Sequence, residues 1–190
     1  MNWLLFAALL ATPKLPHGQH PAPTAEEGAQ QQLSADEVRE RVDGYLGSID
    51  RPITAENWRA LGTQAADVLE PMVSDANALP SRRAKALEGL VAVSPQRAAK
   101  LVGGLARDER EAPVVRVAAM RGAGEVLSHS KALSELKPVL RSASEPGIRK
   151  TAADVLSRHK SGCAAVKEQA ARESAEHREA YQRALERCGE

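Results

Sequence analysis

The chain has 190 residues, 43% of them hydrophobic, and a formal net charge of +1 at pH 7. The 17 basic and 12 acidic side chains of residues 54–160, with almost no aromatic side chains for stacking, argue against a nucleic-acid-binding surface. The few aromatic residues and the lack of alternating apolar and polar positions also argue against a β-sheet, so we expect helices packed through Ala, Leu and Val.

The N-terminus begins with an apolar run at residues 3–11 that stops before Pro13. This run is too short to span a bilayer, so residues 1–25 are interpreted as a signal peptide or apolar N-terminus. No Lys or Arg precedes the run and no A-x-A site follows it, so a frayed apolar tail is the alternative. Residues 12–32 predict a disordered linker, in which His17 and His20 are linker histidines and not metal ligands.

Residues 33–190 are predicted to form a single helical domain. Ser34 and Glu37 make a capping box for a first helix, at about 34–48. Its apolar stripe is expected to consist of Val38, Val42, Tyr45, Leu46 and Ile49. Thr54 is expected to cap a second helix that reaches Pro71 and kinks or ends there.

An internal repeat follows. Pro80, Pro113 and Pro146 recur at an interval of 33 residues, and an arginine follows each proline three positions later. A fixed period of this size indicates stacked units of supersecondary structure. The pattern predicts antiparallel helix pairs at about 54–94, 95–128 and 130–160, with an atypical terminal pair at 162–188.

The repeated P-x-x-R-x-x-A opening of the second helix, with a proline inside the first helix, resembles the HEAT and HEAT-like repeats of compact bacterial type. The resemblance implies an all-α fold, a short right-handed α-solenoid with an N-terminal capping helix and a C-terminal helical hairpin. It also implies that the arginine column stitches the repeats together, by pairing Asp75 with Arg83 and Asp108 with Arg116. The column continues at Arg149, where Glu145 is the nearest acidic residue, and at Arg178.

The two cysteines lie 25 residues apart, too far to bond along one straight helix. If Ala175 takes the place of the repeat proline, the segment becomes a hairpin capped by Ser174, and the cysteines meet at its open end. We therefore predict a Cys163–Cys188 disulfide, which requires an oxidising compartment. A zinc site made of His159, Cys163, His177 and Cys188 is the alternative.

The sequence contains no catalytic motif such as G-x-S-x-G, a P-loop or H-E-x-x-H, so we expect no catalysis, cofactor or metal. Gly103, Gly104, Gly122 and Gly124 are interpreted as sites of close helix packing. His129 and His159 are expected at helix C-termini, where the dipole favours them.

The expected function is that of a monomeric, non-catalytic protein-binding scaffold in the periplasm or secreted, without nucleic acid and without a membrane span after signal removal. Glu88, Arg121 and Asp154, each eight residues after a repeat proline, form the candidate row for a protein partner. The alternatives are a HEAT-like enzyme similar to bilin lyases or alkylpurine glycosylases, and a structural subunit of an envelope complex.

Overall fold

The computed structural model describes residues 33–189, and within this range all regular secondary structure is helical. These residues belong to one compact unit, Leu33–Glu190. The expected signal peptide, the linker and its two histidines lie outside the described residues. None of the helices in 33–189 is long and apolar enough to cross a membrane.

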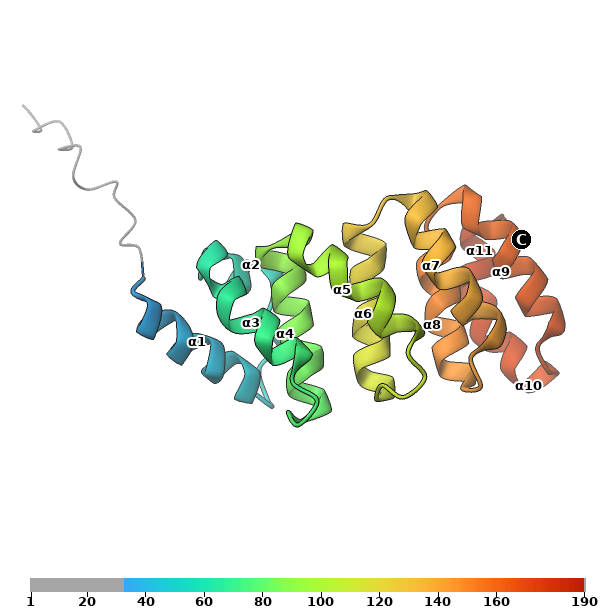
Figure 1. Ribbon diagram of the computed structural model, residues 1–190. Coiled ribbons are helices and arrows are strands. Elements are labelled where there is room, and N and C mark those ends of the chain that lie inside the picture. Colours follow the sequence, from blue (N-terminus) through green and yellow to red (C-terminus); the bar gives the residue numbers. More distant parts are fainter. Residues whose placement is uncertain (1–32, 190) are drawn as a thin grey trace, which may run out of the picture. The chain divides into compact units, whose positions relative to one another are not determined.

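In chain order (Figure 1), the helices are α1 Ala35–Gly47, α2 Ala55–Arg59, the 3-10 turn η1 Thr63–Ala65, α3 Ala66–Ser74, α4 Pro80–Val93, α5 Pro95–Arg107, α6 Pro113–Val126, α7 His129–Ser142, α8 Pro146–Leu156, α9 Lys160–Arg172, α10 Ala175–Arg178, the 3-10 turn η2 Glu179–Tyr181 and α11 Gln182–Arg187.

The capping box predicted at the start of α1 is confirmed. The Ser34 hydroxyl accepts a hydrogen bond from the Glu37 N–H at 3.3 Å, and the Glu37 carboxylate accepts one from the Ser34 N–H at 2.8 Å. Ile49, which we expected on the buried stripe, is instead 93% exposed. The expectation is wrong because α1 ends at Gly47, so Ile49 lies in the following loop and not on the helix face.

The single helix expected from Thr54 to Pro71 is also wrong. Thr54 does cap α2, but this helix ends after five residues. The chain turns at Gly62, whose φ of +77° is readily adopted only by glycine. A new helix, α3, then begins at Ala66 and runs through Pro71. The sequence pattern placed the break at the proline, whereas the break lies nine residues earlier, at the glycine.

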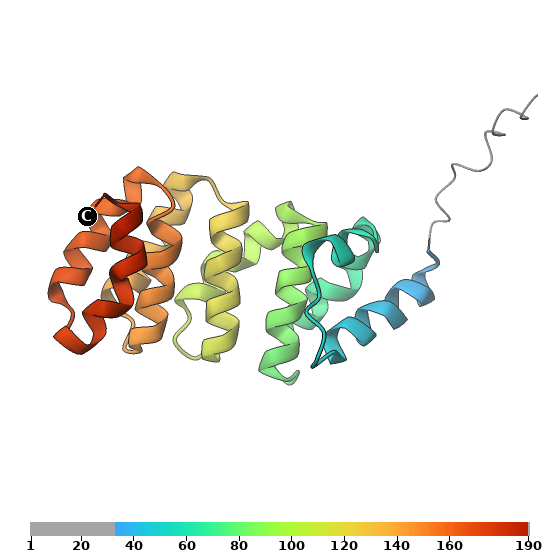
Figure 2. The ribbon, with the colours of Figure 1, turned by 180° about the vertical axis from the view of Figure 1, so that it is seen from behind.

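The helices from α2 onward form two rows. One row contains α3, α5, α7 and α9, and the other contains α2, α4, α6 and α8, followed by η2 and α11. Each helix packs against the next member of its own row, and α3, α5 and α7 also pack against α4, α6 and α8 respectively. The second row is seen side by side in Figure 2. We refer to these as the first row and the second row.

The core between the rows is built mainly from Ala, Leu and Val, as expected; among the described residues, Trp58 and Tyr181 are the buried aromatics. Small residues let the helices approach closely. A Cβ added at Gly122 would lie 2.9 Å from the Val91 side chain, and one added at Gly124 would lie 2.7 Å from that of Val155. These distances are too short for a real contact, so the glycines are required by packing.

The C-terminal hairpin consists of α9 followed by α10, η2 and α11. Its second arm was expected as one helix, but the 3-10 turn η2 interrupts it and buries Tyr181 against Glu173. Ser174 caps α10, as predicted. The sulfur atoms of Cys163 and Cys188 lie 2.09 Å apart, with 5.4 Å between the Cα atoms, so the predicted pair is confirmed at disulfide distance.

Candidate functional site

The arginine column was the strongest candidate from sequence, and its side chains are engaged inside the protein. The Arg83 guanidinium donates from Nε to the Val73 carbonyl oxygen at 3.0 Å. Its two terminal nitrogens donate to both carboxylate oxygens of Glu111, at 2.8 and 2.7 Å. Glu111 lies 28 residues later, in the turn before α6, so Arg83 ties α4 to the preceding helix and to the next repeat.

The expected partners of the column are wrong. Asp75 does not pair with Arg83, nor Asp108 with Arg116; each aspartate accepts a hydrogen bond from the backbone N–H two residues later, at 2.9 and 3.0 Å. A short carboxylate binds the backbone of its own turn in this way, and Asp108 also accepts hydrogen bonds from the Arg110 guanidinium at 3.1 and 3.2 Å. The aspartates therefore shape the turns that the arginines then join.

Arg149 repeats the bidentate arrangement with Glu173, at 2.6 and 2.8 Å, and not with the expected Glu145. Glu173 also accepts hydrogen bonds from Gln169 and Tyr181, both at 3.0 Å. The hydrogen bonds from Arg149, Gln169 and Tyr181 lower the pKa of Glu173 to about 2, although burial acts in the opposite direction. This network fastens the hairpin to α8.

Arg116 and Arg178, the two other arginines of the column, form no ion pair with a carboxylate of the described residues. Arg116 is 2% exposed and donates to the Ala106 carbonyl oxygen at 3.3 Å. Ser144 stands where Glu111 stands in the preceding repeat, so no acidic side chain reaches Arg116 from the next turn. Arg178 is exposed and donates to the Glu173 carbonyl oxygen at 3.2 Å. The column is a structural feature, consistent with the stitching role.

Ion pairs also join consecutive helices of the first row. From α3 to α9, each helix is connected to the next by at least one arginine–carboxylate pair. The pairs are Arg97 with Asp67 and Glu70, Arg107 with Glu135, and Arg141 with Glu168. The sequence analysis did not identify them, although Glu135 and Glu168 are 33 residues apart and could have been found from the repeat period.

The second row has a groove at its N-terminal end. A cavity of about 230 Å³ lies between α2, α4 and α6, with Val91, Ala92 and Ala118 among its apolar lining residues. A second cavity, of about 320 Å³, lies beneath the loop of residues 48–53. Ile53, Trp58 and Glu88 line both. We call the two cavities together the groove.

The charged side chains of the cavity between α2, α4 and α6 are Arg59, Glu88, Arg121 and Glu125. None of the four forms a hydrogen bond or ion pair with another residue in the described part of the chain. Partial burial raises the pKa of Glu88, and the positive charges of Arg121 and Lys85 offset this only in part. The groove thus combines an apolar floor with charges that the chain itself leaves unpaired.

Two of the three residues in the candidate row meet in this groove, namely Glu88 and Arg121. Asp154 does not join them, because it accepts a hydrogen bond from Lys150 at 2.8 Å and lies 3.8 Å from an Arg187 nitrogen. The sequence analysis missed Trp58 and Arg59 as groove residues. No local signal identifies them, since α2 meets α4 and α6 only after the chain turns at Gly62.

The zinc alternative is not supported by the geometry. Cys163 and Cys188 bond to each other, and His177 Nδ1 lies 3.0 Å from the Ser174 hydroxyl. Across residues 33–189, no group of three or more His, Cys, Asp or Glu side chains is arranged to hold a metal ion.

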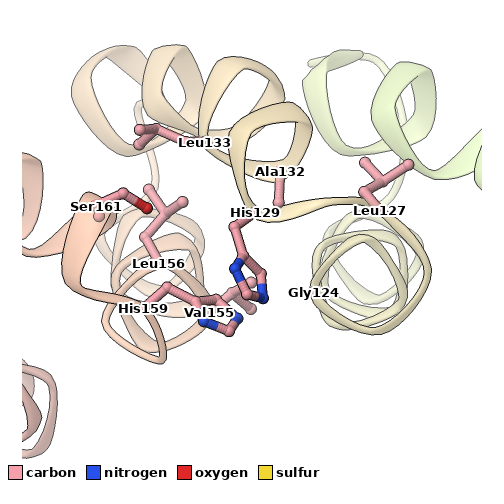
Figure 3. Close-up of a pocket in the computed structure, with 10 residues that line it drawn as sticks. Gly124, Leu127, His129, Ala132, Leu133, Val155, Leu156, His159 and Ser161 are labelled. Carbon is pink, nitrogen blue, oxygen red and sulfur yellow. The ribbon is translucent and has the colours of Figure 1, made fainter.

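His159 stacks on His129, with ring centroids 3.2 Å apart and planes inclined by 28° (Figure 3). Both histidines lie at helix N-termini and not, as expected, at C-termini, because α6 and α8 end before them. Desolvation lowers the pKa of His159, and the charges of His129 and Arg158 lower it further. The cavity beside the rings measures about 10 Å³, which is close to the volume that one water molecule needs. It is therefore too small for a ligand.

Comparison with protein-family models, with curated proteins and with solved structures yields no match to this chain.

Proposed function

We propose that this protein is a non-catalytic, monomeric protein-binding scaffold of the HEAT-like type, a short right-handed α-solenoid whose partner surface is the groove between α2, α4 and α6. Two observations support the solenoid. The sequence repeats with a period of 33 residues, and each helix of a row packs against the next helix of that row. Stacked repeats of this kind present a continuous row of helices to a partner.

The observation that carries the binding role is the contrast in charge pairing. In the first row, arginines and carboxylates neutralise each other between consecutive helices. In the groove, the exposed side chains of Glu88, Arg121, Arg59 and Glu125 form no hydrogen bond or ion pair with another described residue. Exposed charges that form no hydrogen bond within the chain are free to pair with a complementary partner surface, which they attract and orient.

The proposed location is the periplasm or the extracellular space. A disulfide persists in oxidising compartments and is rare where glutathione and thioredoxin keep thiols reduced. The Cys163–Cys188 pair at bonding distance supports export. The apolar run at residues 3–11 has the length of a secretory signal and points in the same direction.

A photocrosslinking experiment tests the proposed surface. A photoreactive phenylalanine derivative is placed at Arg121 in the groove and, in a matched control, at Lys100 on α5. Both positions are exposed, so neither replacement disturbs the core. Irradiation in the native envelope fraction should give a discrete protein adduct from position 121 and none from position 100.

A second variant, Ala92→Tyr, fills the groove from α4 and should abolish the adduct at position 121. Circular dichroism confirms that this variant retains its helices. Equal adducts from both positions, or an adduct that survives Ala92→Tyr, would contradict the groove as the partner surface.

A further inference from the structure

Trp58 places an unpartnered hydrogen-bond donor at the groove. The side chain is only 2% exposed, with its ring against Gly89 and Tyr45. The indole N–H donates to no other described residue. Within residues 33–189, no fully buried side-chain nitrogen or oxygen lacks a partner, so this N–H must reach the surface. Trp58 lines both cavities of the groove, which are the open spaces that its side chain faces.

The Glu88 carboxylate, which lines the same two cavities as Trp58, is a hydrogen-bond acceptor without a partner among the described residues. Asp154, two repeats later on the same row, shows how an acid at this position is satisfied: Lys150, four residues earlier on α8, donates to it at 2.8 Å. The residue four positions before Glu88 is Ala84, so α4 provides no such cation. The charge of Lys85 acts on Glu88, but its ammonium group donates to the Ser48 carbonyl oxygen and forms no hydrogen bond with Glu88.

We propose that the partner segment places a lysine or arginine side chain against Glu88, and that a neighbouring backbone carbonyl of the segment accepts a hydrogen bond from the Trp58 indole. This inference rests on the proposed function. The aliphatic stem of the basic side chain lies on Val91 and Ala92, since long basic side chains bury their methylene groups readily. Arg121, exposed at the rim, pairs with an acidic residue of the same extended segment.

Other kinds of partner side chain would bind less favourably against Glu88. An apolar side chain over Glu88 would remove the carboxylate from water without a counter-charge, which is costly. An acidic side chain would add repulsion to the same cost. A basic side chain restores the pairing that Lys150 provides at Asp154, so charge complementarity selects it.

The test uses the full chain with Trp3→Phe, which leaves Trp58 as the single tryptophan. A phage-displayed library of random twelve-residue peptides is selected on this protein, and the enriched peptides are synthesised. Their binding is measured by the change in Trp58 fluorescence. We expect the enriched peptides to share a Lys or Arg, and replacement of that residue by Ala should weaken binding about tenfold or more.

Glu88→Gln should weaken binding of the same peptides by a similar factor, because it removes the charge and keeps the shape. The matched control is Glu109→Gln, an exposed carboxylate in the turn before α6 and outside the groove, which should change affinity less than about threefold. Neither glutamate has a hydrogen bond to lose, so both variants should fold, and circular dichroism verifies this.

The outcomes separate this inference from the proposed function. If peptides bind, Ala92→Tyr blocks them and Glu88→Gln weakens them selectively, the inference is supported. If Ala92→Tyr blocks them but they lack a basic residue or ignore Glu88→Gln, the groove remains a binding site and the basic-residue inference is overturned. If no enriched peptide is blocked by Ala92→Tyr, both the inference and the proposed surface are overturned.

Discussion

The first row and the groove of the second row both contain arginine and carboxylate side chains, but among the described residues these side chains form ion pairs only in the first row. Between the helices of the first row, Arg97, Arg107 and Arg141 each meet a carboxylate of an adjacent helix. In the groove, the charge of Arg121 acts on Glu88, but the two side chains form no ion pair with each other or with another described residue. The same division exists inside the column, where Arg149 has a carboxylate and Arg116 does not. The charges between the helices of the first row are paired, whereas those of the groove form no ion pair among the described residues.

The largest effect is expected from Arg149→Met. This change leaves Glu173, whose side chain is 4% exposed, buried without its cation, and should cost about 3–5 kcal/mol of unfolding free energy. The matched control is Arg116→Met, which removes a buried guanidinium with one hydrogen bond and should cost only about 1–2 kcal/mol. Chemical denaturation measures both. Equal losses would show that the carboxylate contributes nothing to the column.

Next in size is the loss of the disulfide. The double variant Cys163→Ala, Cys188→Ala should lose about 3 kcal/mol, because the bond closes a loop of 25 residues in the unfolded chain. Reductant should destabilise the unmodified protein by a similar amount and leave the double variant unchanged. Detection of two free thiols by mass analysis of protein purified without reductant would contradict the bond.

A smaller effect is expected from pH. The pKa of His159 is lowered in the folded state, so the folded protein binds this proton less readily than the unfolded chain does. Its contribution to stability is present above the ordinary histidine pKa of about 6.5 and is lost as the pH falls through the lower folded value. The melting temperature should therefore decrease from pH 7.5 toward pH 5. His159→Asn should remove much of this decrease, and an unchanged slope would exclude the histidine pair as its source.

The smallest effect is expected in the groove. Arg121→Gln should change the unfolding free energy by less than about 0.5 kcal/mol, because this side chain has no ion pair to lose. Arg97→Gln, which breaks contacts with Asp67 and Glu70 in the first row, should cost about 1 kcal/mol. A loss at Arg121 as large as that at Arg97 would remove the distinction between the two regions.

The sequence was sufficient for features that depend on nearby residues. The Ser34 capping box, the Ser174 cap and the helices beginning at Pro80, Pro113 and Pro146 follow from short-range patterns. The break at Gly62 was missed because a glycine inside an apolar periodic pattern does not reveal its own φ. For the candidate site, the period placed Glu88 and Arg121 on one row, but Asp154 has the same spacing and is paired by its neighbours.

What the sequence determined by itself is the helical fold, the prolines that begin α4, α6 and α8, and the cysteine pair, because these depend on spacing along one chain. What only the tertiary structure decided is which charges have partners. Arg83 and Arg149 reach carboxylates 28 and 24 residues later, and this difference depends on how the turns pack. The groove likewise depends on the packing of α2 against α4, which the turn at Gly62 and α3 separate along the chain. Partner choice depends on distances between helices, which a linear pattern does not contain.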